Sequence, residues 1–499
     1  MLLRGSKFKN QSSGILIAVS SLPSKYGIGS LGEEAYKFID FLKLSNQSIW
    51  QMLPLVPIGK GNSPYSSQSA FAGEILLIDI DLLVIDGLLN KEDIPERVFS
   101  KNVNYPFIKS FKLPLLKKAT ENFNTDSKEF KSFCDNNHWL YDYSLFMTIK
   151  ETFGNLPFYK WEDSLKYRHP DALKDFKEKH SEKIKFYEIT QFLFYKQYNN
   201  LKKYAGNNGI KLVGDIPFYV SLDSADVWAN PECFKLGRDM TPVLVAGVPP
   251  DIFSSTGQLW GNPVYDWEYH KKTDYSWWKK RLSHNAKLYD IIRIDHFRAF
   301  ADYYTIPYGS PDAKSGNWER GVGMHFWNKM KPLLEDTLII AEDLGGETPE
   351  VRELIERSGF PDMKVLQFAF DSDLKDPFLP KNMNVNCVCY TGTHDNDTTL
   401  GWYEKITPNE KNMFSKLVPM DKSRSPVLSL IAFGMKSRSQ TVIIPLQDYL
   451  ELPSTARMNT PGIPYGNWEW RFENEDITKE LINTILRLTK YRNQEKNRP

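Results

Sequence analysis

Eight short apolar runs recur along the chain and constrain its fold more than any other feature of the sequence. They span residues 15–22, 49–56, 211–220, 290–297, 338–344, 364–370, 386–395 and 440–446. Each run has the length of one strand, and near-continuous apolarity is what a parallel strand buried on both faces requires. The pattern therefore predicts a parallel β-sheet at the centre of the molecule.

The segments between the runs carry helical patterns. Ala35, Phe38 and Leu42 fall on one face of a helix after the first run. Thr348 suits the N-cap of another helix, and Gly359 suits the position just beyond its end. Alternating strands and helices are typical of parallel sheets, and eight strands favour a closed (β/α)8 barrel, the TIM barrel. Periodicity alone leaves an open doubly wound sheet as the alternative.

The spacing between the runs is uneven. We predict a single (β/α)8 domain over residues 1–499, with large inserted subdomains after the second and third strands. Residues 58–205 are predicted to form a mainly helical insertion. Residues 221–285, rich in Pro, Gly and Trp, are predicted to form a loop-rich insertion over a cleft, because the loops after the C-terminal strand ends build the sites of such barrels.

Charge and length exclude several classes of protein. The chain has 63 Lys and Arg against 62 Asp and Glu, a balance that gives no basic surface for nucleic acid or for an anionic membrane. No apolar run approaches the roughly 20 residues of a membrane span, and the first residues show no targeting signal. We therefore expect a cytoplasmic protein with no nucleic-acid or membrane partner.

The sequence also shows no pattern typical of a metal-binding or cofactor-dependent protein. The four cysteines, Cys134, Cys233, Cys387 and Cys389, form no CxxC pair, and no His, Cys and Asp residues cluster with ligand spacing. No glycine-rich loop suits phosphates, which disfavours a route through pyridoxal phosphate. We expect no metal, no cofactor and a reducing compartment, with Cys387 and Cys389 buried on one side of a strand.

Acidic residues stand at the ends of four of the runs. They are Asp215, Asp295, Glu342 and Asp395. A barrel directs such residues to one mouth, and two carboxylates flanking a bond suffice for glycoside chemistry. Each acid alone is equally well explained as a cap or an ion-pair partner. Charged groups at the ends of apolar strands destabilise the fold unless they are paired, so several of them together indicate a site.

Longer stretches of the chain match a known family. They cover residues 21–23, 26–29, 50–55, 63–65, 214–217, 246–251, 257–263, 293–298, 341–345, 390–397 and 458–462. On these stretches the chain resembles the amylomaltases, the 4-α-glucanotransferases of the α-amylase superfamily. The resemblance extends from about residue 14 to residue 471, and it implies a TIM barrel that acts on α-glucans.

The resemblance implies a role for each acid at the mouth. Asp295 matches the nucleophile that forms a covalent glucosyl–enzyme intermediate. Glu342 matches the general acid/base, and Asp395 matches the third acid, which grips the sugar at the cleavage point. Arg293 is expected to keep Asp295 ionised through its positive charge, and His394 is expected to donate to a sugar hydroxyl.

The resemblance also implies substrate contacts away from the acids. Gln258 and Trp260 are expected on the acceptor side, in the segment 249–263, whose Pro and Gly content predicts a shaped loop. Ser63 and Tyr65 resemble residues that border an outer glucan-contact region. Asp215 is expected to orient its neighbours, with a purely structural role as the alternative.

Two further contacts complete the predicted site. Asn467 is expected to contribute from the loop after the eighth strand. Phe368 alternates with Leu366 and Phe370 and is expected near the cleaved sugar, with core packing as its alternative. The chain departs from the family pattern at five positions, which puts its fine glucan specificity in question: Glu74, Ile75, Ala301, Asp362 and Ser372.

The implied reaction transfers a segment of an α-1,4-glucan to the 4-hydroxyl of glucose or another glucan by a retaining double displacement, with glucan cyclisation as a further activity. The expected donors are α-1,4-glucans and maltooligosaccharides, and the expected acceptors are glucose or maltooligosaccharides. The protein is expected to be a monomer or a weak homodimer. The alternatives are an α-glucan hydrolase with the same three acids and a non-catalytic glucan-binding protein, which the presence of all three acids disfavours. The acceptor-side stretch favours transfer over hydrolysis.

Overall fold

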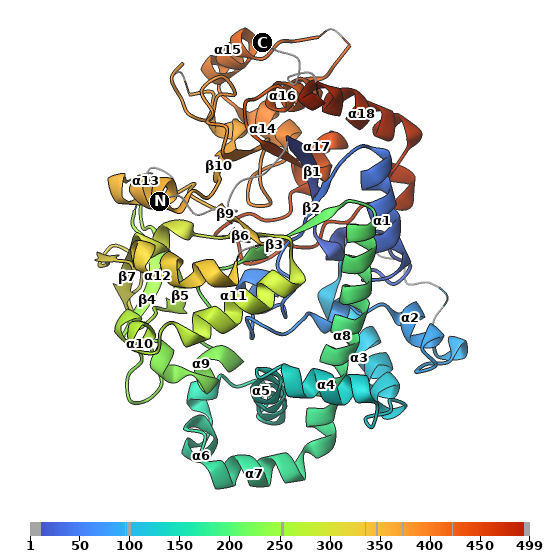
Figure 1. Cartoon of the computed structure of the whole chain (residues 1–499), viewed down its shortest axis with the longest axis vertical. Coiled ribbons are helices and arrows are strands. Elements are labelled where there is room, and N and C mark those ends of the chain that lie inside the picture. The colour runs from blue at the N-terminus through green and yellow to red at the C-terminus, as the bar shows by residue number, and fades with distance from the viewer. Residues whose placement is uncertain are drawn as a thin grey trace.

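The centre of the molecule is a closed barrel of eight parallel strands in the order β1-β12-β11-β10-β9-β6-β3-β2 (Figure 1). The computed structural model describes residues 11–94, 96, 101–250, 254–334, 336–345, 348–371, 374–421 and 423–493. The barrel strands are β1 (Ser12–Leu16), β2 (Ile49–Gln51), β3 (Lys211–Ile216), β6 (Ile291–Ile294), β9 (Leu338–Ala341), β10 (Asp362–Val365), β11 (Cys387–Tyr390) and β12 (Thr441–Pro445). Each overlaps one predicted apolar run, so the closed barrel is confirmed and the open sheet is excluded.

The predicted apolar runs are longer than the strands that they contain, and the first and sixth runs show the reason. The first run turns into a 3-10 helix at Val19–Ser21, and the sixth turns into another at Leu366–Phe368. Both turns remain largely buried at the barrel mouth. Burial makes a turn as apolar as a strand, which is why periodicity alone overestimated the length of these two strands.

Local sequence signals explain how the barrel and its helices pack. A Cβ atom on Gly14 of β1 would lie 2.5 Å from the carbonyl oxygen of Ile49 in β2, so only glycine allows these strands to approach. Helix α1 (Glu33–Leu44) buries its predicted apolar face. Helix α13 (Pro349–Ser358) begins at Thr348, whose hydroxyl accepts the Val351 N–H, and ends at Gly359, which has φ 71°. These helix predictions are confirmed.

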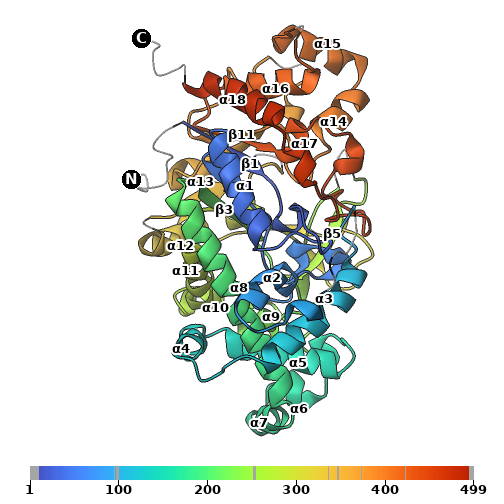
Figure 2. The same ribbon diagram turned by 90° about the vertical axis from the view of Figure 1, so that its right-hand side faces the viewer.

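A helical region lies between β2 and β3. It contains α2 (Ile80–Ile85), α3 (Tyr105–Glu121), α4 (Lys128–Asn136), α5 (Leu140–Thr152), α6 (Asp163–Lys166), α7 (Pro170–Lys179) and α8 (Ser181–Asn207). Both views place α4, α6 and α7 at the end of the molecule opposite α14–α16, and α8 runs from this end back to the barrel (Figures 1 and 2). The division of the chain at residues 58–205 and 221–285 stays a prediction.

A second sheet beside the barrel was not expected from the sequence. It has the order β5-β4-β7-β8 and is antiparallel. Its strands are β4 (Leu244–Val248), β5 (Gln258–Pro263), β7 (Asp302–Pro307) and β8 (Asn317–Arg320). The prediction of loop over 249–263 is therefore wrong for its second half, because backbone pairing with β4 makes residues 258–263 an edge strand. Helices α9 (Ala225–Ala229), α10 (Trp267–Lys272) and α11 (Ser276–Leu288) accompany this sheet in sequence.

The remaining helices follow the later barrel strands. They are α12 (Gly323–Met330), α14 (Thr399–Lys405), α15 (Pro408–Leu417), α16 (Pro426–Met435), α17 (Leu446–Tyr449) and α18 (Lys479–Asn493). Among the described residues no helix is both long and apolar enough to cross a membrane. Because all eight barrel strands run in one direction, the residues that follow β3, β6, β9 and β11 meet at one mouth.

Candidate active site

Arg293 of β6 organises the buried floor of the mouth. Its Nη1 atom lies 2.7 Å from both carboxylate oxygens of Asp215, its ladder partner on β3, and 3.1 Å from Oδ1 of Asp295. The Asp215 side chain is 0% exposed, so it lies out of reach of a substrate in the cleft. Asp215 is therefore linked to the cleft through its contacts with Arg293 and Tyr65.

Asp295 stands just beyond the end of β6 and reaches the cleft. Burial is the main reason why its pKa is raised above the usual carboxylate range, and Glu342, Asp215 and Asp395 raise it further. Arg293 lowers this pKa, in the expected direction, but burial outweighs its charge. Because 28% of the Asp295 side chain remains exposed, the carboxylate is open to a ligand from the mouth.

Glu342 follows β9, and both of its carboxylate oxygens are held by backbone N–H groups. Oε2 accepts the N–H of His296 at 2.7 Å, and Oε1 accepts the N–H of Leu344 at 2.8 Å. His296 adopts φ 52°, a conformation rare for a non-glycine residue, and this turn aims its N–H at Glu342. The residue directly after Asp295 thus fixes the second acid.

Asp395 and His394 lie in the turn after β11. His394 Nε2 lies 3.4 Å from Asp395 Oδ2, and Asn459 donates to Asp395 Oδ1 at 2.6 Å. The ring of Tyr65 stacks on the His394 ring, with centroids 5.1 Å apart and an interplanar angle of 11°. The Tyr65 hydroxyl donates to Asp215 at 2.9 Å, which joins this turn to the floor of the mouth.

Tyr65 lies against Asp215 and the His394 ring, and its predicted place at the border of an outer glucan-contact region stays a prediction. The loop after β2 brings Tyr65 to these side chains, and two residues shape that loop. The Ser63 hydroxyl accepts the Tyr65 N–H at 3.1 Å and caps the 3-10 helix Pro64–Ser66. The Glu74 carboxylate accepts the N–H of Ile58 at 2.7 Å and holds the start of the loop. Ser63 thus shapes the turn that carries Tyr65.

Trp260 and Gln258 approach the acids from β5. The Trp260 indole is 38% exposed and donates through Nε1 to Gln258 Oε1 at 3.1 Å. It meets the His296 ring edge to face, with centroids 4.9 Å apart. Burial lowers the pKa of His296 to about 4, so its imidazole is neutral at physiological pH. Trp260 thus contacts the turn that connects Asp295 to Glu342.

Phe368 and Asn467 differ in how they face the solvent. Phe368 is 42% exposed, whereas Leu366 and Phe370 are buried, so core packing does not explain Phe368. Asn467 is buried, and both ends of its amide bond within the loop: Oδ1 accepts the Thr460 N–H and Nδ2 donates to the Ile463 carbonyl. Asn467 therefore closes the loop 460–467, and its predicted contact with substrate stays a prediction.

The departures from the family pattern are accommodated locally. Glu74 caps two backbone N–H groups, and Asp362 pairs with Lys364 at 2.7 Å. Ile75 and Ala301 are partly buried. Ser372 lies outside the described residues. None of the four described departures makes a hydrogen bond or an ion pair with Asp295, Glu342 or Asp395.

Three residues of the site had no role in the sequence analysis: His296, Arg457 and Asn459. His296 and Asn459 contact the acids directly, and Arg457 bonds to the carbonyl oxygen of Asp395. Both His296 and Asn459 fall in stretches that match the family, but no local pattern indicates a left-handed backbone or a contact across 64 residues. Within the described residues no group of three or more His, Cys, Asp or Glu could hold a metal ion.

Comparisons with known proteins agree with this geometry. Residues 17–478 match the model of a family described as 4-alpha-glucanotransferase. The chain is 44% identical to the 4-alpha-glucanotransferase of Clostridium butyricum over 95% of this chain and 98% of that protein. It is 42% identical to that of Thermus thermophilus, over 94% and 96%. The amylomaltase from Streptococcus agalactiae, solved in complex with acarbose, superimposes with a TM-score of 0.94 at 40% identity, over 97% of this chain and 99% of that one. The chain therefore belongs to the 4-alpha-glucanotransferase family.

Proposed function

We propose that the mouth of the barrel carries out glucan transfer by double displacement, with Asp295 as the nucleophile and Glu342 as the acid/base. The observation that carries the proposal is the pairing of these two acids through a single turn: Asp295 contacts Arg293, and the next residue, His296, holds Glu342. Such a turn keeps both carboxylates beside the same glycosidic bond of a bound glucan.

The proposed chemistry runs in two balanced steps. Asp295 attacks the anomeric carbon of the donor, and the bond to the 4-oxygen of the departing glucan breaks as Glu342 gives that oxygen a proton. In the second step, Glu342 takes the proton of an acceptor 4-hydroxyl, whose oxygen attacks the anomeric carbon and releases Asp295. Asp295 must be ionised at the start, so its raised pKa limits activity at low pH.

The other side chains of the mouth hold the sugar in this proposal. Asp395, with 40% of its side chain exposed, is open to sugar hydroxyls, and His394 lies beside it. The Tyr65 ring supplies a flat apolar surface, and its hydroxyl is fixed by Asp215. The donor is an α-1,4-glucan or maltooligosaccharide, and the acceptor is glucose or a maltooligosaccharide. Four free cysteines, three of them buried, support a cytoplasmic location for the enzyme.

Transfer competes with hydrolysis for the intermediate on Asp295. A positioned acceptor outcompetes water because well-oriented groups reach effective molarities of about 10⁵ M or more. The exposed Trp260 indole beside His296 is placed to stack on such an acceptor and to align its 4-hydroxyl. The acceptor contact is therefore the feature that favours transfer over the hydrolase alternative.

The test is the product profile from maltotriose as the sole substrate. A transferase yields glucose together with oligomers longer than maltotriose, whereas a hydrolase yields only shorter products. The Asp295→Asn variant is the matched control and yields neither. A profile that contains no product longer than maltotriose would overturn the proposal of transfer.

A further inference from the structure

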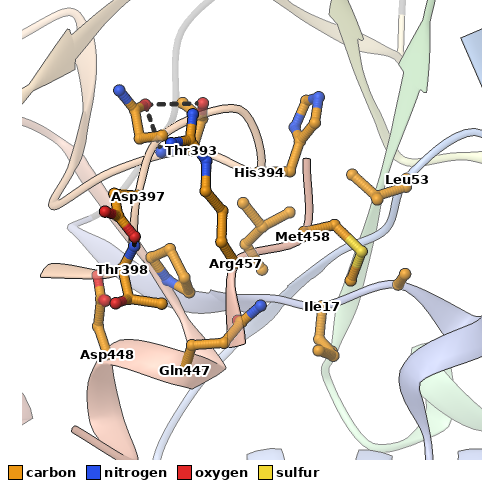
Figure 3. A pocket seen from close by; sticks show the side chains of 14 residues that line it. Ile17, Leu53, Thr393, His394, Asp397, Thr398, Gln447, Asp448, Arg457 and Met458 are labelled. Atoms are coloured by element: carbon orange, nitrogen blue, oxygen red, sulfur yellow. Dashed lines mark hydrogen bonds between the residues drawn. The ribbon is translucent and has the colours of Figure 1, made fainter. Parts of the chain in front are cut away.

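Two segments of the chain interlock at Asp395. One follows β11 and carries His394 and Asp395, and the other follows β12 and carries Arg457 and Asn459. The backbone N–H of Asn459 donates to the His394 carbonyl at 3.1 Å, and its side chain donates to Asp395 Oδ1 at 2.6 Å. Arg457 donates to the carbonyl oxygens of both Asp395 and Asn459. Figure 3 shows Arg457 extending from beside Met458 toward Thr393.

These bonds give the Asp395 carboxylate one orientation. Its side chain is 40% exposed in a turn, so packing alone does not select a rotamer. Asn459 holds Oδ1, which leaves Oδ2 on the side of His394, 3.4 Å from Nε2. The two Arg457 bonds fix the backbone under both partners, so the donor and the acceptor of the 2.6 Å bond cannot drift apart.

The kind of donor matters as much as its position. Asp215, on the floor of the mouth, is held by the cationic Arg293, which offsets its charge. Asp395 is held by a neutral amide, which orients the carboxylate and leaves its negative charge intact. An undiminished charge is what a carboxylate needs to stabilise the oxocarbenium-like transition state of glycoside cleavage.

We propose that Asn459 is the positioning residue of Asp395: it orients this carboxylate without neutralising it, and Arg457 holds the two segments together. The inference rests on the proposed function, because Asp395 must act in the reaction for its orientation to matter. Loss of the bond should therefore lower kcat more than it raises the donor KM, since Asp395 interacts most strongly with the transition state.

Asn459→Asp reverses the contact without changing its size. Above the pKa of the new pair, two carboxylates face each other and repel, so Asp395 loses its orientation. When one proton is shared, the pair regains both a hydrogen bond and the single negative charge of the native pair. The other groups that act on Asp395 are His394 beside it, Asp295 after β6, Tyr65 from the loop after β2 and Arg457 below it, and all are present in the variant.

The experiment measures maltotriose turnover across pH for Asn459→Ala, for Asn459→Asp and for the native protein. We expect Asn459→Ala to lower kcat about 100-fold, with a donor KM within about threefold of the native value. We expect the kcat/KM of Asn459→Asp, divided by that of the native enzyme at each pH, to rise as the pH falls. Taking this ratio removes the part of the Asp295 titration that the two proteins have in common. The added carboxylate can only raise the pKa of Asp295 further, which would make the ratio fall as the pH falls, so a rise reports the shared proton. Asn136→Ala, an exposed asparagine of α4, is the matched control and should leave both quantities unchanged.

Two results would overturn the inference. One is an Asn459→Ala variant that retains kcat within about threefold of the native enzyme. The other is a ratio for Asn459→Asp that does not change with pH, which is what a purely structural role of Asn459 predicts. This second result would overturn the inference even if Asn459→Ala does not fold. Asp395→Asn distinguishes a failure of this inference from a failure of the proposed function. If it is inactive while Asn459→Ala is active, only the inference fails, and if Asp295→Asn and Asp395→Asn are both active, the proposed function fails.

Discussion

The end of β6 and the edge strand β5 both face the mouth, but they are built in opposite ways. Arg293 and Asp215 are almost fully buried, and they contact each other through two bonds of 2.7 Å. On β5, residues 258–261 are exposed, and the Trp260 indole donates only to its neighbour Gln258 among the bonds that the structure gives it. Rigid elements are suited to bond breaking, which tolerates little displacement, and an exposed edge is suited to receiving different acceptors.

This contrast separates two consequences of mutation. A change at the end of β6 should affect the reaction itself and, because the groups are buried, the stability of the fold. A change on β5 should leave both nearly intact and alter only which molecule accepts the glucosyl group.

The largest effect is expected for Asp295→Asn. The amide keeps the shape of the side chain but cannot form the covalent intermediate, so turnover should fall by about 10⁴-fold or more. Binding of a maltooligosaccharide, measured by calorimetry, should remain. Normal turnover in this variant would remove Asp295 from the mechanism.

A smaller effect on activity and a large effect on stability are expected for Arg293→Met. The variant leaves Asp215 buried without its cation, which should lower the free energy of unfolding by about 3–5 kcal/mol. Arg293 lowers the pKa of Asp295, so its loss should raise that pKa further. Because the proposed nucleophile must be ionised to attack, the acid limb of kcat/KM should move to higher pH. Denaturant unfolding and a pH profile measure the two effects, and Arg293→Lys, which keeps the charge, should shift the limb less. An acid limb that stays in place would show that Arg293 does not tune Asp295.

The smallest effect on total cleavage is expected for Trp260→Ala. The indole is partly exposed and packs on the His296 ring, so its loss should lower the free energy of unfolding by about 1 kcal/mol, less than the change expected for Arg293→Met. Loss of stacking on the acceptor should reduce the ratio of transfer to hydrolysis about tenfold. Leu259→Ala is the matched control, because Leu259 is the exposed neighbour on the same strand. Equal ratios in the two variants would mean that β5 does not select the acceptor.

The barrel could be predicted because its cause is local. Each strand is buried on both faces, so each leaves a continuous apolar run, and Cys387 and Cys389 are buried as expected. The ends of α13 were predictable for the same reason, since Thr348 and Gly359 act within one turn of the chain.

The second sheet and the details of the site could not be predicted because their causes are distant. Strand β5 is exposed along residues 258–261 and carries no apolar alternation, so only its pairing with β4 makes it a strand. The φ of 52° at His296 accompanies a bond to Glu342, which lies 46 residues away. Tyr65 reaches the centre of the mouth through a contact with Asp215 across 150 residues.

The seam between β1 and β12 has a consequence for how the protein is made. Ser12 and Thr441 share a hydrogen bond of 2.9 Å across 429 residues, and this pairing closes the ring. Until the ribosome has released β12, β1 and β11 each lack one neighbour and expose an unpaired edge. Contacts this far apart in sequence form slowly, so the growing chain passes through a long aggregation-prone stage. The nearly complete polypeptide, with its barrel still open, is therefore the form of this chain that we expect to aggregate most readily.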